Sequence, residues 1–237
     1  MKNLVLIAVL TALSISLNAQ KTIEKTIDYK NQEINIDLDF ATNIEIRTWE
    51  KTSVYIKADL SADDEKYLDL YELHVSDGAT RITIKSDALP VFEAFQKEYE
   101  KNHPNRENNY NQVGLKHVFN YTLYIPKDSK AKLSSISGDL NAENIEADFT
   151  ADLISGDINI KEYKGNLKLT TISGEIDLRM INTSLTAETI QGNIYADEKL
   201  KFSSDDRMVG QKIAGETANA NSKLKLNTIS GNMYLRY

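Results

Sequence analysis

Ile136-Ser137-Gly138-Asp139-Leu140 is the first of five copies of one motif in this chain of 237 residues. The later copies are Ile154-Ser155-Gly156-Asp157-Ile158, Ile172-Ser173-Gly174-Glu175-Ile176, Ile190-Gln191-Gly192-Asn193-Ile194 and Ile229-Ser230-Gly231-Asn232-Met233. The first four copies follow one another at a step of 18 residues. Self-similarity at a short fixed period indicates a stack of repeated units, each of which buries its apolar face against its neighbours.

Within one unit the apolar residues are spaced as in a β-strand and not as in a helix. The apolar positions of the third unit are Leu167, Leu169, Ile172, Ile176 and Leu178, with Lys168, Glu175 and Asp177 between them. A hexapeptide repeat is excluded, because steps of six residues from Ile136 reach Ala142 and Asp148 instead of aliphatic residues. The calcium-binding nonapeptide repeat is also excluded, because its paired glycines are missing.

These patterns predict an all-β fold, a single-stranded β-solenoid of the β-helix type with turns of about 18 residues. It should be right-handed, because right-handed crossovers are preferred between parallel strands. Stacked turns lie about 4.8 Å apart, so the motif isoleucines should form one internal column. That column is Ile136, Ile154, Ile172 and Ile190. The motif glycines should mark corners where a side chain is disfavoured, namely Gly138, Gly156, Gly174, Gly192 and Gly231.

The chain before the repeats alternates in the same way but lacks the period. We therefore expect residues 21–128 to form an irregular strand region that caps the repeats of residues 129–237 and is continuous with them. Residues 89–117 interrupt the alternation. Their aromatic residues fall at helical spacing and predict a short helix over 91–101, followed by a polar loop.

Residues 1–20 are typical of a secretory signal peptide, with Lys2 at the start, an apolar run over 4–17 and a small residue, Ala19, near the end. The run is short for a membrane span, and no second apolar run follows it. The sequence thus predicts an exported protein in the periplasm, on the cell surface or secreted. It also predicts no transmembrane span once the signal peptide has been cleaved.

The composition excludes several classes of protein. A net charge of −7 without a basic cluster in the sequence argues against a nucleic-acid partner. The absence of cysteine excludes disulfides and the lipid-modified cysteine of a bacterial lipoprotein. No motif in the sequence indicates a cofactor.

The motif units, together with Tyr124-Ile125-Pro126-Lys127 and Arg47-Thr48-Trp49-Glu50, resemble the bacterial "putative adhesin" family of β-strand-repeat proteins, a domain of unknown function. The resemblance extends from about Ile34 to the end of the chain. It implies an exported β-solenoid and offers no catalytic residues to carry over.

No catalytic set is evident, so we expect no enzymatic activity. His74, His103 and His117 lack the spacing of a metal site on one element. Ser137 and Ser155 recur at corners, where a small polar residue suits the turn, and neither has a histidine nearby in the sequence.

A polar strip is the candidate ligand site. It consists of outward positions on successive turns, Asp139, Asn141, Asp157, Asn159, Glu175, Asp177 and Tyr195. Carboxylates stacked about 5 Å apart repel each other by about 1 kcal/mol in solvent, which a bound cation or sugar hydroxyls would relieve. The alternative is a solvated face that keeps the sheet from aggregating.

Three classes of function stay open. The first is an exported, non-catalytic adhesin or binding module for a surface polymer or protein, with a glycan or an envelope protein as partner. The second is an envelope-sensing or assembly protein that docks through the end of the stack. The third is a polysaccharide-cleaving enzyme, which needs a base beside the acids, and the sequence places none on that face.

Overall fold

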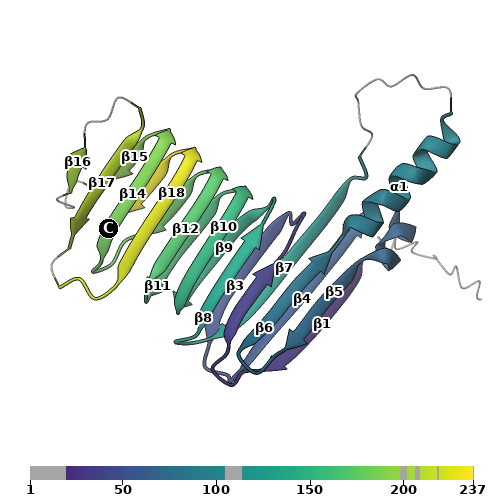
Figure 1. The fold of residues 1–237 in the computed structure, drawn as a ribbon, viewed down its shortest axis with the longest axis horizontal. Helices are drawn as coiled ribbons and strands as arrows, with labels where there is room; N and C mark the ends of the chain where they lie inside the picture. The colour runs from purple at the N-terminus through teal and green to yellow at the C-terminus, as the bar shows by residue number, and fades with distance from the viewer. Residues whose placement is uncertain (1–19, 105–113, 198–201, 206–208, 218, 237) are drawn as a thin grey trace, which may run out of the picture.

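The computed structural model describes residues 20–104, 114–197, 202–205, 209–217 and 219–236. Within these residues the chain forms two mixed β-sheets that enclose one apolar core (Figure 1). Of the predicted signal peptide, residues 1–19 lie outside the described residues, so export stays a prediction.

Sheet A has nine described strands in the order β1-β4-β7-β3-β9-β11-β13-β19-β15. Their bounds are Lys21–Asp28 (β1), Ser53–Ala62 (β4), His117–Pro126 (β7), Asn43–Trp49 (β3), Asp139–Glu146 (β9), Ile158–Lys164 (β11), Ile176–Arg179 (β13), Met233–Arg236 (β19) and Ile194–Ala196 (β15). The strands are parallel from β7 to β15, whereas β4 is antiparallel to both β1 and β7.

Sheet B has ten described strands in the order β16-β17-β14-β18-β12-β10-β8-β2-β6-β5. Their bounds are Ser203–Asp205 (β16), Gln211–Glu216 (β17), Ser184–Gln191 (β14), Lys223–Ser230 (β18), Leu167–Ser173 (β12), Asp148–Ser155 (β10), Lys130–Ser135 (β8), Glu33–Asp37 (β2), Arg81–Asp87 (β6) and Glu72–Asp77 (β5). The strands are parallel from β14 to β6, whereas β17 is antiparallel to both β16 and β14, and β5 is antiparallel to β6.

The predicted single-stranded β-solenoid is wrong, although the all-β class is right. Each motif separates two strands, one in each sheet, as β10 and β11 show on either side of Gly156. Both sheets are open and mixed, with antiparallel strands at one end of sheet A and at both ends of sheet B. The 18-residue period survives as register, because Phe149 pairs with Leu167 and Ile158 with Ile176.

The last repeat lies inside the stack and not at its end. Strand β18 pairs with β12 on one side and with β14 on the other, and β19 lies between β13 and β15. Figure 1 shows β18 in yellow between the green strands β12 and β14. The fifth motif copy is therefore stacked between the third and the fourth.

The predicted internal column of isoleucines is also wrong. The motif isoleucines are exposed by 41% at Ile136, 50% at Ile154, 44% at Ile172 and 47% at Ile190. The inward positions of β12 are Leu167, Leu169 and Thr171. Ile172 comes three residues after Leu169, which breaks the two-residue period of a strand and turns the side chain outward.

A buried threonine takes the inward place beside the corner. Thr171 Oγ1 donates to the Gly156 carbonyl at 3.0 Å, and Thr228 Oγ1 donates to the Gly174 carbonyl at 3.2 Å. Each hydroxyl thus satisfies a carbonyl of the turn below it, which a buried hydroxyl requires. These bonds tie successive corners together.

The N-terminal strands carry the two helical segments, α1 (Leu89–Asn102) and the 3-10 helix η1 (Glu65–Leu70). The helix predicted over 91–101 lies within α1, at the end of the stack opposite to β16 (Figure 1). The ring of Phe92 packs edge-on against Phe40 with centroids 5.0 Å apart, which fixes α1 against the sheets. The proposed division at residue 128 stays a prediction.

We predict that Ile172→Asp lowers the free energy of unfolding by less than about 1 kcal/mol, because this side chain faces solvent. Leu169→Asp, three residues earlier in the same strand, should lower the free energy of unfolding by several kcal/mol, because it buries an unpaired charge. Urea unfolding of the two variants measures the difference. Equal losses would mean that the strand faces are assigned wrongly.

Candidate functional site

The outer face of sheet A carries part of the predicted strip. In-register positions on six neighbouring strands place side chains in one line, which we call the sheet A row: Glu45, Asn141, Asn159, Asp177, Tyr234 and Tyr195. The structure thus brings together Asn141, Asn159, Asp177 and Tyr195 of the predicted residues.

The other predicted residues form a separate line at the corners. Asp139 Oδ1 accepts a hydrogen bond from the backbone N–H of Asp157 at 2.9 Å, and Asp157 Oδ1 accepts one from the N–H of Glu175 at 2.8 Å. Asn232 Oδ1 accepts in the same way from the N–H of Asn193 at 3.0 Å. Each turn therefore supplies the acceptor for a backbone donor of the next turn. These hydrogen bonds offset the repulsion between stacked carboxylates without a bound cation.

The amides of the sheet A row also bond to one another. Asn141 Nδ2 donates to Asn43 Oδ1 at 2.7 Å, and Asn159 Nδ2 donates to Asn141 Oδ1 at 3.2 Å. The remaining donor and acceptor capacity of these amides points to solvent, and Asn159 is exposed.

A line of cationic side chains lies beside the sheet A row: Arg47, Lys161, Arg179 and Arg236. Lys161 Nζ lies 2.5 Å from Glu143 Oε1, and Arg236 is ion-paired with Asp177. Two shallow depressions follow this border, with volumes of about 150 Å³ and about 620 Å³. The expectation that this face holds no basic residue beside its acids was wrong, and the face is not simply acidic.

Two stacked tyrosines end the sheet A row. The rings of Tyr195 and Tyr234 lie 5.3 Å apart between centroids, with an interplanar angle of 11°. Tyr195 is 52% exposed, on the edge strand β15. Its outer ring face is therefore available for stacking.

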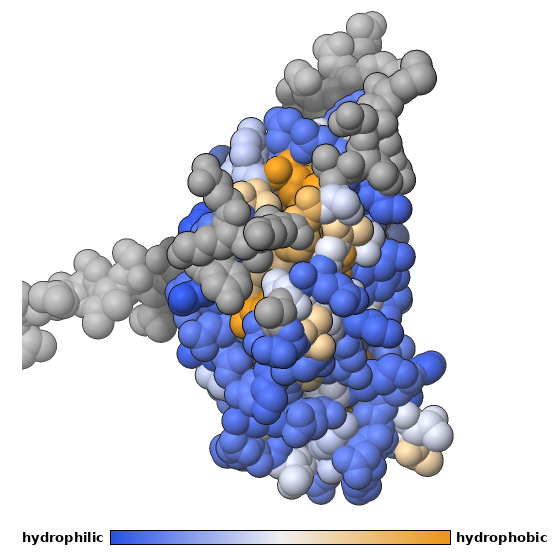
Figure 2. Space-filling model, turned by 90° about the vertical axis from the view of Figure 1, so that its left-hand side faces the viewer, coloured by the Kyte–Doolittle hydropathy of each residue, from blue (hydrophilic) through white to orange (hydrophobic). Residues whose placement is uncertain are grey.

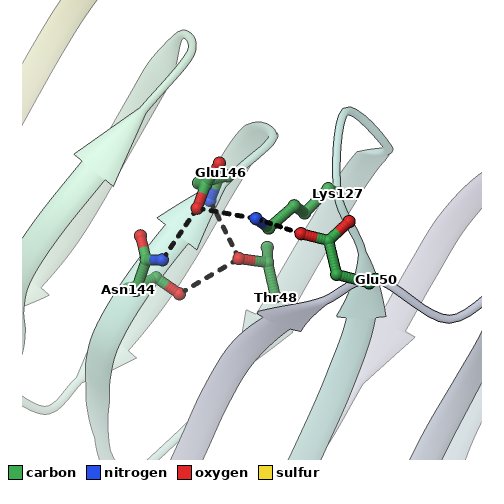
Figure 3. Close-up of polar contacts among 5 residues, drawn as sticks. All are labelled: Thr48, Glu50, Lys127, Asn144 and Glu146. Atoms are coloured by element: carbon green, nitrogen blue, oxygen red, sulfur yellow. Dashed lines mark hydrogen bonds and ion pairs between the residues drawn. The ribbon is translucent and has the colours of Figure 1, made fainter.

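Figure 3 shows a polar network at the junction between the irregular strands and the first repeat. Lys127 Nζ lies 2.5 Å from Glu50 Oε1 and 3.2 Å from Glu146 Oε1 (Figure 3). Asn144 Nδ2 donates to Glu146 Oε1 at 3.0 Å, and Thr48 Oγ1 accepts from the Glu146 N–H at 3.2 Å. The network holds the ends of β3, β7 and β9 together.

The network is poorly suited to acid–base catalysis. Hydrogen bonds to Glu50 and then Glu146 raise the pKa of Lys127, which keeps the lysine protonated at neutral pH and so unable to accept a proton as a general base. The hydrogen bond from Asn144, followed by Lys127, lowers the pKa of Glu146, which removes the proton a general acid would need. Both shifts favour a permanent ion pair and a structural role.

The other predicted polar residues are dispersed. His74 Nε2 lies 3.3 Å from Glu72, while His103 and His117 each contact a backbone carbonyl through Nδ1. Ser137 Oγ donates to the Ala41 carbonyl at 3.1 Å. Among the described residues, no group of three or more histidine, aspartate or glutamate side chains could hold a metal ion. No helix in the described part of the chain is long and apolar enough to cross a membrane.

The sequence analysis missed a basic depression on the outer face of sheet B. It has a volume of about 480 Å³, and its charged lining residues are Arg81, Lys130, Lys132, Lys168, Lys223, Lys225, Glu33 and Asp148. The signal was present as lysines at alternate positions of two strands, Lys130 and Lys132 on β8 and Lys223 and Lys225 on β18, with Lys168 on β12. The sequence alone could not show that these lysines lie on one surface, because β18 pairs with β12 although the two strands are far apart in the chain.

Taken together, the fold and its rows define a two-sheet β-repeat protein with broad, polar outer faces. Residues 124–236 match the family described as Toastrack DUF4097. The predicted family resemblance is thus confirmed for this part of the chain.

One solved structure shows the same fold. A "putative cell adhesion protein" from Clostridium sporogenes aligns with a TM-score of 0.56 and 12% identity, over 92% of this chain and 99% of that chain. "Putative adhesin" structures from Bacteroides fragilis and Parabacteroides merdae each align over 92% of this chain, and over 98% and 96% of their own. Their TM-scores are 0.35 and 0.27, with identities of 10% and 9%. No curated protein matches the chain.

We predict that Asp157→Ala lowers the free energy of unfolding by about 1–2 kcal/mol, because it removes the acceptor of the Glu175 N–H. Asp157→Asn keeps an oxygen at this position and should cost clearly less. Urea unfolding at neutral pH compares the two variants. Equal losses would show that the hydrogen bond between turns contributes little.

Proposed function

We propose that the protein is an exported, non-enzymatic binding module of the adhesin type that holds a surface glycan along the sheet A row. The observation that carries the proposal is the exposed Tyr195 ring, stacked on Tyr234 at the end of a line of amides and charged groups. The name of the solved structure that shares the fold and the predicted signal peptide support an adhesin at the cell surface, in the periplasm or secreted.

The chemistry of the row suits a linear polymer of sugars. The face of a tyrosine ring packs against the apolar face of a sugar ring, while amides and charged groups bond to its hydroxyls. The row crosses six strands, which corresponds to a length of about 24 Å at the usual strand spacing. A polymer would therefore make several weak contacts in register with the strands, and their effects would combine.

The proposal that the protein is not an enzyme has electrostatic support. A hydrogen bond from Lys161 lowers the pKa of Glu143, as Asn144 and Lys127 lower that of Glu146. A polysaccharide-cleaving enzyme needs the opposite shift on its general acid. The acid and base pairs on this face are thus held ionised by each other.

A second candidate is docking of an envelope-sensing or assembly partner at the end of the stack. The edge strand β15 has three residues, and Val209 near it is 68% exposed. Figure 2 shows apolar surface at this end, with hydrophilic residues around it. Exposed apolar surface of this kind marks interaction sites when it is extensive.

We predict that Tyr195→Ala abolishes or strongly weakens glycan binding, because the stacking platform is lost. Binding of the mature protein to a glycan array identifies a ligand, and calorimetry with that ligand measures the change. Ile190→Ala, an exposed apolar truncation on the same terminal turn, is the matched control and should bind as the wild type does.

Glycan binding that survives Tyr195→Ala unchanged would contradict the sheet A row as the site. A protein that bound no glycan, but captured an envelope protein in a manner sensitive to Val209→Asp, would replace the first candidate with the second.

A further inference from the structure

The basic depression on sheet B lies on the outer face opposite to the sheet A row. It extends over strands β18, β12, β10, β8, β2 and β6, which spans about 24 Å across the sheet. Six cationic side chains line it against two carboxylates, although the whole chain carries a net charge of −7. The depression is thus a local cationic site on an acidic protein.

Half of these cations are already in ion pairs. Lys130 and Arg81 both contact Glu33, at 2.8 Å and 3.4 Å, and Lys132 lies 3.0 Å from Asp152. The hydrogen bonds that Glu33 accepts from Lys130 and then from Arg81 lower the pKa of Glu33. The Glu33 carboxylate is therefore held in its ion pairs with Lys130 and Arg81 at the rim of the depression.

The other half have no ion-pair partner among the described residues. These are Lys168, Lys223 and Lys225, at the end of the depression formed by β12 and β18. Asp148 forms no ion pair with them, and its Oδ1 accepts hydrogen bonds from the backbone N–H and the side chain of Asn166 at 3.1 Å and 2.9 Å. Three ammonium groups therefore remain free to bind an anion.

Two of the free lysines oppose each other directly. Lys168 on β12 is in register with Lys225 on β18, and both side chains are exposed. Like charges opposite each other on neighbouring strands destabilise a sheet. A bound anion between them would reverse the sign of this interaction.

We propose that this depression binds a linear anionic polysaccharide, a glycan that carries carboxylate or sulfate groups. The elongated shape fits a polymer better than a single small anion, and the free ammonium groups provide the countercharge at its β18 end. Free lysines focus the local potential and attract a polyanion even to a protein of negative net charge. This site is independent of the sheet A row.

A nucleic acid fits the lining less well. Proteins that bind single strands stack bases on exposed aromatic rings. The described lining has one aromatic residue, Phe149, and it is buried with 1% of its surface exposed. A sugar polymer needs no such stacking if its charges and hydroxyls make the contacts.

The test measures binding of the mature protein to four probes by calorimetry at two salt concentrations. The probes are polygalacturonate, dextran sulfate, neutral dextran and a single-stranded oligonucleotide. We expect binding of one or both anionic glycans and none of neutral dextran. The first two probes distinguish a carboxylate from a sulfate ligand.

The variant Lys168→Gln/Lys225→Gln should weaken binding about tenfold or more and reduce the dependence of log affinity on log salt by about two. Lys25→Gln/Lys97→Gln removes the same charge from exposed positions elsewhere and should bind as the wild type does. A second readout is stability at low salt. Without ligand the Lys168→Gln/Lys225→Gln variant should unfold at higher urea than the wild type, and polygalacturonate or dextran sulfate should stabilise it less than they stabilise the wild type.

Unchanged affinity in the Lys168→Gln/Lys225→Gln variant, or no binding of either anionic glycan, would overturn the proposal. Tighter binding of the oligonucleotide than of both glycans would also overturn it, in favour of a nucleic-acid site. Tyr195→Ala should leave binding of the anionic probes unchanged, so failure here and failure of the sheet A row are distinguishable.

Discussion

The structure depends on the approach of one corner glycine to the carbonyl oxygen of the corner below it. A Cβ atom built on Gly174 would lie 2.1 Å from the Gly156 oxygen, and one built on Gly231 would lie 1.9 Å from the Gly174 oxygen. Atoms of a side chain cannot come this close to backbone atoms. Glycine therefore allows the backbone of each turn to pack directly against that of the next turn, so that equivalent residues in each sheet stay in register.

This register explains where the surface chemistry lies. A residue that recurs in the motif becomes a line across the strands, whether it is a corner carboxylate, an outward isoleucine or an amide of the sheet A row. Insertion of β18 and β19 between the third and fourth repeats then changes the sequence of groups along each line. It places Lys225 beside Lys168 on one face and Tyr234 beside Tyr195 on the other.

The repeat period, the all-β class, the family and the outward placement of Asn141, Asn159 and Asp177 could all be predicted, because strand alternation and the 18-residue step are local properties of the sequence. Two features could not. The inward position beside the corner is threonine and not isoleucine, because the strand alternation of Leu167 and Leu169 continues to Thr171. The stacking order of the repeats and the basic depression depend on pairing between distant segments, which a period does not specify.

The most direct test of the central claim compares Gly174→Ala with Gly114→Ala in urea unfolding. A Cβ on Gly114 would meet no atom within 4 Å, so this control carries the same change in backbone entropy without the close contact. The account predicts that Gly174→Ala lowers the free energy of unfolding by about 2 kcal/mol or more, because the Gly156 carbonyl must move. Gly114→Ala should change it by less than about 1 kcal/mol. Equal, small effects of the two substitutions would contradict the glycine contact as the constraint that sets the stack.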